Sequence, residues 1–219
     1  MDIPEMKYTS DDKDEEGRPT PRGEIWIRGD TIFEGYYKDK AKTEEAITPD
    51  GWLQTGDVGM LLPGSNAMRI IDRKKNIFKL QQGEYVAAEK VEGIYCRSPL
   101  INEAFLHGDS YQSFPVAVVT VNKAGIEGLA AKQGIKKPFE EACKDKAIRT
   151  LLCREMESVG KEGGLKGFEQ AKNVYIETEP LFMSKDILST TMKMQRFAAR
   201  QVYAAEIEQM YKEGPLQTK

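Results

Sequence analysis

The sequence predicts an α+β fold in which a β-rich first part is followed by a mixed α/β second part. Up to Ile71, short apolar runs alternate with glycine turns, as they do in strands. A charged break then covers Asp72–Asn76. Beyond it, strand-like runs are interleaved with segments whose apolar residues recur at helical spacing. We therefore place a domain boundary in the charged segment 72–77.

Composition restricts the class of protein before any motif is considered. The 219 residues are 40% hydrophobic, and a net charge of −3 produces no field that would attract nucleic acid or an anionic membrane. Three cysteines, Cys96, Cys143 and Cys153, lack metal-site or C-x-x-C spacing, so we expect reduced thiols in an intracellular protein. No apolar run approaches the roughly 18 residues that a membrane-spanning helix requires.

The first part is expected to begin with a loop and to continue as strands. Residues 1–22 are polar, acidic and broken by prolines, without the apolar core of a signal peptide, and are predicted to be a loop or a disordered start. Alternating polar and apolar residues in Glu24–Arg28 predict a strand with one buried face. The runs Gly59–Leu62 and Ala67–Ile71 flank the turn residues Pro63–Asn66 and predict a hairpin.

The second part is predicted to be a single small domain. Strands are expected at Ile77–Leu80 and Asn173–Glu177, with a glycine turn at Gly83. The runs Ile101–Leu106 and Val116–Val121 have strand length and are expected to pair. Helical spacing of apolar residues predicts helices over 87–95, 124–133, 138–159 and 196–212, the last packing on the core through Phe197, Val202, Ile207 and Met210.

One constellation in the first part has the chemistry to bind a sugar. Gln54–Asp57 places a carboxylate after a tight glycine turn, and Asp72-Arg73 begins fifteen residues after Asp57. A carboxylate can accept hydrogen bonds from both hydroxyls of a ribose, and an arginine can donate to the same sugar or to a nearby phosphate. Taken alone, however, a Thr-Gly-Asp sequence is more often only a turn.

Five runs follow, in order and spacing, motifs that resemble those of the adenylate-forming acyl-CoA synthetases. They are Gly23–Gly29, Gly35–Tyr37, Asp50–Asp57, Ile71–Lys79 and Gln82–Val86. Within that superfamily, Gln82–Glu92 and Phe105–Phe114 resemble the long-chain fatty acyl branch in particular. The resemblance extends from about Gly23 to Arg196.

The resemblance implies a role for several residues. Asp57 would bind the ribose hydroxyls of ATP and of the acyl-adenylate, with Arg73 beside it. Lys75 would be the hinge about which the C-terminal domain rotates between two half-reactions. Gly83 and Glu84 would lie along the passage of CoA, where a residue without a side chain lets a slender ligand pass close to the backbone. No residue is identified as a metal ligand.

The segment Leu188–Arg196 resembles the terminal lysine motif of the family. In that motif the lysine reaches the α-phosphate and the carboxylate during adenylation, so Lys193 is the expected catalytic residue. A flexible ammonium can stabilise the negative charge that gathers there without forming a covalent bond. The match is imperfect, since Thr190 replaces the usual proline and Met192 the frequent aromatic residue. By spacing alone, Lys193 would be an ordinary surface lysine.

The remaining candidate residue offers little chemistry. His107 is the only histidine of the chain, and the sequence places no Ser or Cys partner beside it that would form a nucleophilic triad. It is expected to be a satisfied residue at the end of a strand.

The domains implied by the resemblance are a loop or disordered start at 1–22, the last sub-barrel of a large adenylation domain at 23–71, a hinge at 72–77 and a mobile C-terminal domain at 78–219. The phosphate-gripping loop and the acyl pocket of the family are not in this sequence, so we expect a fragment that is inactive alone. The intact enzyme would use long-chain fatty acid, ATP, Mg²⁺ and CoA. It would not bind nucleic acid, and it would be cytoplasmic or peripheral on endomembranes through parts outside this sequence.

Two alternatives remain open at this stage. The chain could come from another acyl- or aryl-CoA ligase of the superfamily, because the acyl pocket that selects the substrate is missing. It could also be a non-catalytic interaction module derived from a synthetase, an interpretation that the altered Ser189–Thr191 favours and the retained Asp57 and Lys193 oppose.

Overall fold

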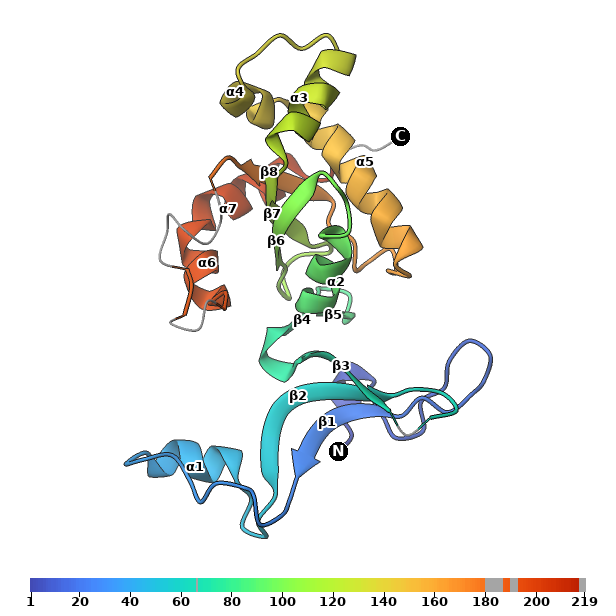
Figure 1. Cartoon of the computed structure of the whole chain (residues 1–219), viewed down its shortest axis with the longest axis vertical. Helices are drawn as coiled ribbons and strands as arrows, with labels where there is room; N and C mark the ends of the chain where they lie inside the picture. The colour runs from blue at the N-terminus through green and yellow to red at the C-terminus, as the bar shows by residue number, and fades with distance from the viewer. Residues whose placement is uncertain (66, 180–186, 190–192, 217–219) are drawn as a thin grey trace. The chain divides into compact units, whose positions relative to one another are not determined.

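The computed structural model describes residues 1–65, 67–179, 187–189 and 193–216. The chain forms two compact units, Met1–Ile77 and Phe78–Lys219 (Figure 1). Its sheets are small and helices accompany them, so the α+β class is confirmed.

The first unit is organised by an antiparallel sheet of three strands. In spatial order these are β1 (Arg22–Ile27), β2 (Leu53–Leu61) and β3 (Met68–Arg73). The strand expected at Glu24–Arg28 and the hairpin around Pro63–Asn66 are therefore confirmed, with Asn66 itself outside the described residues. The sheet is open, so the expected sub-barrel is not closed by the described residues. Three strands are too few to curl into a barrel.

The start of the chain lies along β1. After the short helix η1 (Pro4–Met6), the segment turns back, and the backbone N–H of Glu24 donates to the carbonyl of Met1 at 2.8 Å. Ile3 is buried. A Cβ at Gly23 would lie 2.3 Å from the Met1 carbonyl oxygen, which explains why only glycine fits at this close approach.

A short helix between β1 and β2 was not anticipated from the sequence. Helix α1 (Lys40–Ala46) is capped by Asp39, whose carboxylate accepts from the backbone N–H of Lys42 at 3.0 Å. None of its residues is buried. Because α1 has no apolar face, hydrophobic periodicity cannot reveal it.

The second unit begins with a two-stranded sheet and a helix. The strands β4 (Ile77–Lys79) and β5 (Tyr85–Ala87) pair, with β4 starting at the last residue of the first unit. Helix α2 (Ala88–Tyr95) follows β5 directly. A short helix, η2 (Lys74–Asn76), precedes β4. Of these elements, β4 and α2 occupy the strand and helix positions expected from the sequence, whereas η2 and β5 were not predicted.

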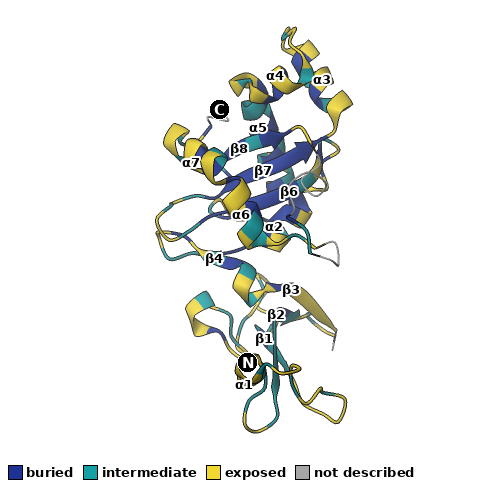
Figure 2. Cartoon of the chain, turned by 90° about the vertical axis from the view of Figure 1, so that its left-hand side faces the viewer, coloured by how far each residue is buried: buried dark blue, intermediate teal, exposed yellow. Residues whose placement is uncertain are grey.

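The core of the second unit is built on a sheet with the order β6-β7-β8. Strands β6 (Ile101–His107) and β7 (Val116–Val121) are antiparallel, as expected, and β8 (Asn173–Glu177) runs parallel to β7. All six residues of β7 are buried (Figure 2). One face of the sheet packs against α2, α3 (Lys123–Lys132) and α5 (Lys146–Glu162), and the other packs against α6 (Arg196–Val202) and α7 (Ala204–Glu213). Burial on both faces explains the nearly continuous apolar run in β7.

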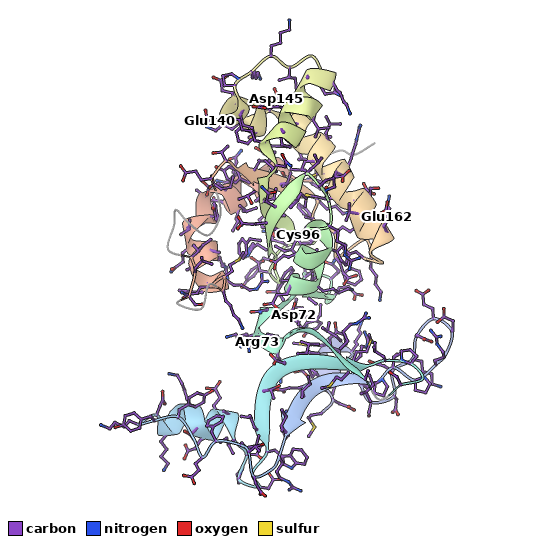
Figure 3. All side chains as sticks on the ribbon, in the orientation of Figure 1. Asp72, Arg73, Cys96, Glu140, Asp145 and Glu162 are labelled. Atoms are coloured by element: carbon purple, nitrogen blue, oxygen red, sulfur yellow. The ribbon has the colours of Figure 1, made fainter. Side chains whose placement is uncertain are left out.

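Two predicted helices are each divided in the structure. The pattern over 138–159 forms α4 (Phe139–Lys144) and α5 (Lys146–Glu162), separated by Asp145, whose carboxylate caps α5 through the Ala147 N–H at 2.9 Å (Figure 3). The C-terminal pattern forms α6 (Arg196–Val202) and α7 (Ala204–Glu213), divided at Tyr203. Helix α3 (Lys123–Lys132) is continuous.

The prediction that 196–212 packs on the core is only partly correct. Ile207 and Met210 are buried, but Phe197 is 75% exposed and Val202 is also exposed. Ala199, Tyr203, Ile207 and Met210 recur at helical spacing across the break and pack in one core cluster, so Phe197 and Val202 lie off that face. Instead, Ala199 and Tyr203 fill the core position beside α6.

The three cysteines lie in or directly after helices of the second unit. Cys143 in α4 and Cys153 in α5 are buried, Cys96 at the end of α2 is exposed, and all three thiols are unpaired as expected (Figure 3). Among the helices of the described ranges, none combines the length and the apolar character that crossing a bilayer requires.

Candidate functional site

Local backbone chemistry orients Asp57 within β2. The hydroxyl of Thr55 donates to the carbonyl of Ile25 on β1 at 2.8 Å and accepts from the Asp57 N–H at 3.0 Å. Gly56, between them, has φ of +71°, which favours glycine. The pairing of β1 with β2 is irregular between Glu24 and Trp26. Such irregularities re-aim side chains at the edges of functional sites.

The structure brings the predicted pair, Asp57 and Arg73, together. They are directly opposite each other on β2 and β3, and the Arg73 Nε lies 3.0 Å from the Asp57 Oδ1. The Asp57 side chain is 25% exposed and that of Arg73 48%. Next to the pair, the buried Asp72 accepts from the Arg73 N–H at 2.6 Å (Figure 3). Both predicted side chains therefore remain accessible to a ligand.

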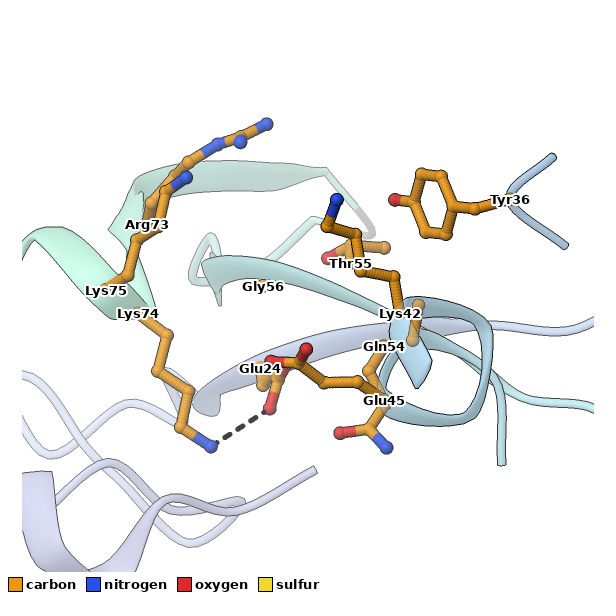
Figure 4. A pocket seen from close by; sticks show the side chains of 11 residues that line it. Glu24, Tyr36, Lys42, Glu45, Gln54, Thr55, Gly56, Arg73, Lys74 and Lys75 are labelled. Carbon is orange, nitrogen blue, oxygen red and sulfur yellow. Dashed lines mark hydrogen bonds and ion pairs between the residues drawn. The ribbon is translucent and has the colours of Figure 1, made fainter. Parts of the chain in front are cut away.

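A cavity of about 550 Å³ in the first unit is lined by Arg73 and by Gly56, the neighbour of Asp57, while Asp57 itself does not line it (Figure 4). In the close view Arg73 and Lys75 project together on one side and Tyr36 stands on the other. The cavity is lined by Glu24, Tyr36, Lys42, Glu45, Ala46, Gln54, Thr55, Gly56, Arg73, Lys74 and Lys75. The predicted hinge residue Lys75 and the predicted nucleotide contact Arg73 thus share one cavity.

The cations that line the cavity differ in exposure, and three of them, Lys42, Lys74 and Arg73, have a carboxylate partner. Lys74 reaches the buried carboxylate of Glu24, with 3.3 Å between Nζ and Oε2. Lys42 is held by Asp39 at 2.9 Å, and that hydrogen bond raises the pKa of Lys42. Arg73 and Lys75 are both exposed. An anion such as a phosphate would meet these two cations first.

Sequence reasoning assigned no role to several of the lining residues. Tyr36, Lys42 and Glu45 come from the α1 region, which carried no periodic signal. The only available signals were the run Gly35–Tyr37 and the capping residue Asp39. Both place the region in the first unit without showing that it faces the cavity.

Gly83 and Glu84 belong to the second unit. They form the turn between β4 and β5, in which the Gly83 N–H donates to the Leu80 carbonyl at 2.9 Å and the Leu80 N–H donates to the Glu84 carbonyl at 2.8 Å. Gly83 has φ of +85°, and a Cβ there would meet only Lys79 Cε at 4.0 Å. The turn requires glycine for its backbone conformation, and the space beside it is open.

The turn at Gly83 is tied to the loop after β6. The Gln81 N–H donates to the Gln112 carbonyl at 3.0 Å, and the Gln82 side-chain amide donates to the Ser113 carbonyl at 3.1 Å. The two stretches singled out as resembling the long-chain branch are therefore in direct contact. The two hydrogen bonds hold the Gly83 turn against the loop that follows β6.

Lys193 also lies in the second unit and is exposed. Its backbone carbonyl accepts from the Ser189 N–H at 2.8 Å, and its N–H donates to the Ser189 hydroxyl at 3.1 Å. Leu188 and Met194 form an antiparallel bridge beside this pair. Thr190 and Met192, the two departures from the family motif, lie outside the described residues. The backbone of Lys193 is therefore held by hydrogen bonds between residues 188–189 and residues 193–194.

His107 is the last residue of β6 and is buried, as expected for a strand-end residue. Burial, with a contribution from Arg200, lowers its pKa to about 4, although Asp109 lies 3.8 Å away. The ring is therefore neutral at neutral pH. Within the described ranges, no group of three or more His, Cys, Asp or Glu side chains is arranged to hold a metal ion.

Comparison with curated proteins places the chain beside one class of enzyme. No family model matches. The peroxisomal long chain acyl-CoA synthetase 7 of Arabidopsis thaliana is 46% identical over 214 residues, which are 97% of this chain and 30% of that protein. Long-chain-fatty-acid–CoA ligase 1 of Homo sapiens is 41% identical over 211 residues, 96% of this chain and 29% of that protein. The chain thus spans about 30% of the length of the curated relatives it matches.

Solved structures show the same similarity. The adenylation domain of a carboxylate reductase from Mycobacterium chelonae has a TM-score of 0.80 and 32% identity, covering 97% of this chain and 30% of that one. The A domain of a carboxylic acid reductase from Segniliparus rugosus, in complex with AMP and a co-purified carboxylic acid, has a TM-score of 0.80 and 33% identity, with coverage of 97% and 31%. An O-succinylbenzoate coenzyme A synthetase from Bacillus subtilis shares the fold at 19% identity, with a TM-score of 0.55 and coverage of 80% and 29%.

Proposed function

We propose that this chain, which belongs to the long-chain acyl-CoA synthetases as a C-terminal portion, supplies the ribose contact, the hinge and the catalytic lysine of an ATP-dependent fatty acid:CoA ligase. The similarity to such enzymes over 97% of the chain supports the class. The observation that carries the site is the Asp57–Arg73 pair beside a cavity with exposed cations. Because the chain spans about 30% of its relatives, the activity is proposed for the intact protein.

In the first half-reaction, the fatty acid carboxylate attacks the α-phosphorus of ATP. The bond from that phosphorus to the pyrophosphate oxygen breaks, and a mixed anhydride, the acyl-adenylate, forms. Asp57 accepts hydrogen bonds from the ribose hydroxyls, and Arg73 donates to the same sugar or to a phosphate. The Lys193 ammonium stabilises the charge that gathers between carboxylate and phosphate. This term would be the largest that the chain contributes to the rate.

In the second half-reaction, the CoA thiol loses its proton to solvent, its sulfur bonds to the acyl carbon, and the bond from that carbon to the AMP oxygen breaks. The Gly83 turn and Glu84 would line the approach of the pantetheine arm, since the space beside Gly83 is open. Lys75 would be the hinge between the two half-reactions. It lies in η2, two residues before the last residue of the first unit, Ile77. Rotation about one short segment is a common way to present two faces of a domain in turn.

The chain offers candidate contacts for ATP but no cluster of ligands for Mg²⁺ among its described residues. The exposed edge of Asp57 and the cations at Arg73 and Lys75 suit the ribose and phosphates of ATP. Mg²⁺ is different, since the described residues contain no cluster of three or more ligating side chains. Mg²⁺ usually binds mainly through phosphates and water, so we propose that it accompanies the phosphates of ATP.

We further propose that the parent protein works inside the cell, in the cytoplasm or peripherally on endomembranes. Its substrate, a long-chain fatty acid, partitions into lipid, and each buried methylene contributes about 0.8 kcal/mol to that preference. The net charge of −3 offers no attraction to nucleic acid.

The test is acyl-CoA formation followed by mass spectrometry with palmitate, Mg-ATP and CoA. This chain alone is compared with the upstream-extended protein carrying Lys193 or Lys193→Ala. Product from the extended protein only, lost with Lys193→Ala, supports the proposal. An extended protein inactive with fatty acids of every chain length and with aryl acids would favour a non-catalytic module. Activity confined to short-chain or aryl acids would keep the superfamily and change the substrate.

A further inference from the structure

Arg196, three residues after Lys193, forms a bidentate ion pair with Glu92. Arg196, the first residue of α6, donates from NH1 to Glu92 Oε1 at 2.8 Å and from NH2 to Oε2 at 2.5 Å. Glu92 lies on α2 and is 8% exposed. Its Oε1 also accepts from the Leu106 N–H on β6 at 2.7 Å. One carboxylate therefore joins α2, β6 and the start of α6.

The segment that carries Lys193 is anchored at both ends. On one arm, Ile187 is fully buried in the core beneath α6 and α7, and its carbonyl accepts from the Gln195 N–H at 2.7 Å. The Gln195 side chain donates to the Leu188 carbonyl at 2.9 Å. The other arm ends at Arg196, which is fixed on Glu92. Between these anchors Lys193 bonds to Ser189 through its backbone while its side chain is exposed.

We propose that Glu92 and Arg196 are positioning residues that hold the backbone of Lys193 in the place that adenylation requires. The inference rests on the proposed function, and it assigns to the chain a role beyond the lysine itself. A planar guanidinium bonded through two nitrogens fixes direction as well as distance, which a lysine cannot reproduce. The ammonium of a long, flexible side chain stabilises a transition state only where the backbone that carries it is already in position.

The burial of Glu92 strengthens the argument. A carboxylate with so little exposure must be matched by a partner charge and by hydrogen bonds, and here the matching groups are Arg196 and the Leu106 N–H. Without the Glu92–Arg196 pair, the start of α6 loses the contact that holds it on α2. We therefore expect the start of α6 to shift. Lys193 is displaced with it because only two residues separate it from Arg196.

The experiment separates the two half-reactions in the upstream-extended protein. Adenylation is measured as pyrophosphate release without CoA, and thioester formation is measured from supplied acyl-adenylate and CoA. Arg196→Lys and Glu92→Gln are compared with wild type. We expect kcat for adenylation to fall about 10- to 100-fold, with the KM for ATP and the thioester step unchanged. An equal fall in both half-reactions, or none in adenylation, would overturn the proposal.

Arg149→Lys is the matched control. Arg149 is another arginine of the second unit with a carboxylate partner: its NH2 lies 2.8 Å from Glu213 Oε2, and its Nε donates to the Val174 carbonyl at 2.8 Å. It is on α5, outside the Lys193 segment. We expect both half-reactions to be unchanged in this variant. A selective loss of adenylation in Arg149→Lys would show that any lost arginine has this effect, and would overturn the proposal.

A second readout needs no activity. Hydrogen exchange of the amides of Lys193 and Gln195 is measured in the 219-residue chain. We expect faster exchange in Arg196→Lys and Glu92→Gln, and no change in Arg149→Lys. If the extended wild-type protein forms no acyl-adenylate, the proposed function fails while this measurement still decides whether the pair holds the segment. Unchanged exchange in both variants would contradict the inference by itself.

Discussion

Asp57 and Arg73 face each other across the β2–β3 pairing, with 3.0 Å between the arginine Nε and the carboxylate Oδ1. They are sixteen positions apart in sequence, and the intervening hairpin brings them into register. An acceptor for hydroxyls and a donor for hydroxyls or phosphate thus stand side by side on a rigid sheet. Sites on strands are held more precisely than sites on loops.

Asp57→Asn in the extended protein is expected to raise the KM for ATP about 10- to 100-fold, because a hydrogen bond to a charged acceptor contributes about 1.5–3 kcal/mol. The free energy of unfolding should change by less than about 1 kcal/mol, since the ion pair with Arg73 is partly exposed. Initial rates over a range of ATP concentrations and urea unfolding measure the two effects. Asp30→Asn, at an exposed carboxylate outside the cavity lining, is the control. An unchanged KM in Asp57→Asn would contradict the ribose role.

Gly83→Ala is expected to lower the free energy of unfolding by about 1 kcal/mol or more, because φ of +85° is strained for any residue with a Cβ. Steric overlap would not contribute, since the nearest atom to such a Cβ is 4.0 Å away. Gly128→Ala, inside α3 with no neighbour within 4 Å, should have the opposite sign and stabilise the helix by about 1 kcal/mol. Urea unfolding of this chain measures both. No loss of stability in Gly83→Ala would show that the turn tolerates a side chain.

The stability of the second unit should depend on pH through His107. Its folded pKa, about 4, is below the ordinary value of 6.5, chiefly because the ring is buried; Arg200 lowers it further and Asp109 opposes. The neutral ring therefore contributes stability that is complete above about pH 6.5 and is lost as pH falls toward 4. His107 is the only histidine, so its NMR resonance can be followed without assignment.

His107→Gln is the variant that checks this dependence. It should flatten the unfolding free energy between pH 6.5 and 5, a range in which most carboxylates have already ionised. A titration of the His107 ring in the folded protein near pH 6.5 would contradict the prediction.

Tyr95→Phe is expected to reduce the free energy of unfolding by about 1–3 kcal/mol. The buried Tyr95 hydroxyl accepts from the Ala171 N–H at 2.8 Å, and its removal leaves that buried donor unsatisfied. Tyr111→Phe, at a side chain that is largely exposed, should be neutral. Thermal or urea unfolding distinguishes the two, and an equal effect of both variants would mean that the Ala171 N–H finds another acceptor.

Elements with strong patterning could be predicted from the sequence alone. The runs at Ile101–Leu106 and Val116–Val121 pair as expected, because neighbouring strand-length apolar runs separated by a loop with turn residues favour antiparallel pairing. The breaks at Asp145 and Tyr203 were missed for different reasons. Asp145 is a capping residue whose effect could have been recognised. Tyr203 carries no local signal, and its buried hydroxyl bonds to Glu177 on β8, a tertiary contact that no sequence window contains.

The candidate site was predictable only in part. Asp57 was interpreted, on its residues alone, as part of a turn, whereas it lies within β2. Its chemistry suggested a sugar contact, the resemblance to a family favoured that role over a simple turn, and the structure pairs Asp57 with Arg73. The cavity depends on α1, whose residues show no buried face, and on the buried Glu24 that holds Lys74. Such a cavity arises from the meeting of distant segments and has no signature in any one of them.

The three thiols of the second unit differ in exposure, so their reactivity can report local unfolding of that unit. Burial raises the pKa of Cys143 to about 11 and that of Cys153 to about 12, whereas Cys96 is exposed. Burial and the nearby Glu92 raise the pKa of Cys96 as well, but its thiol is the exposed one of the three, so a thiol reagent would modify Cys96 first. Cys143 and Cys153 would react only when α4 or α5 opens. Their modification rates therefore give the opening frequency of this core without any introduced probe.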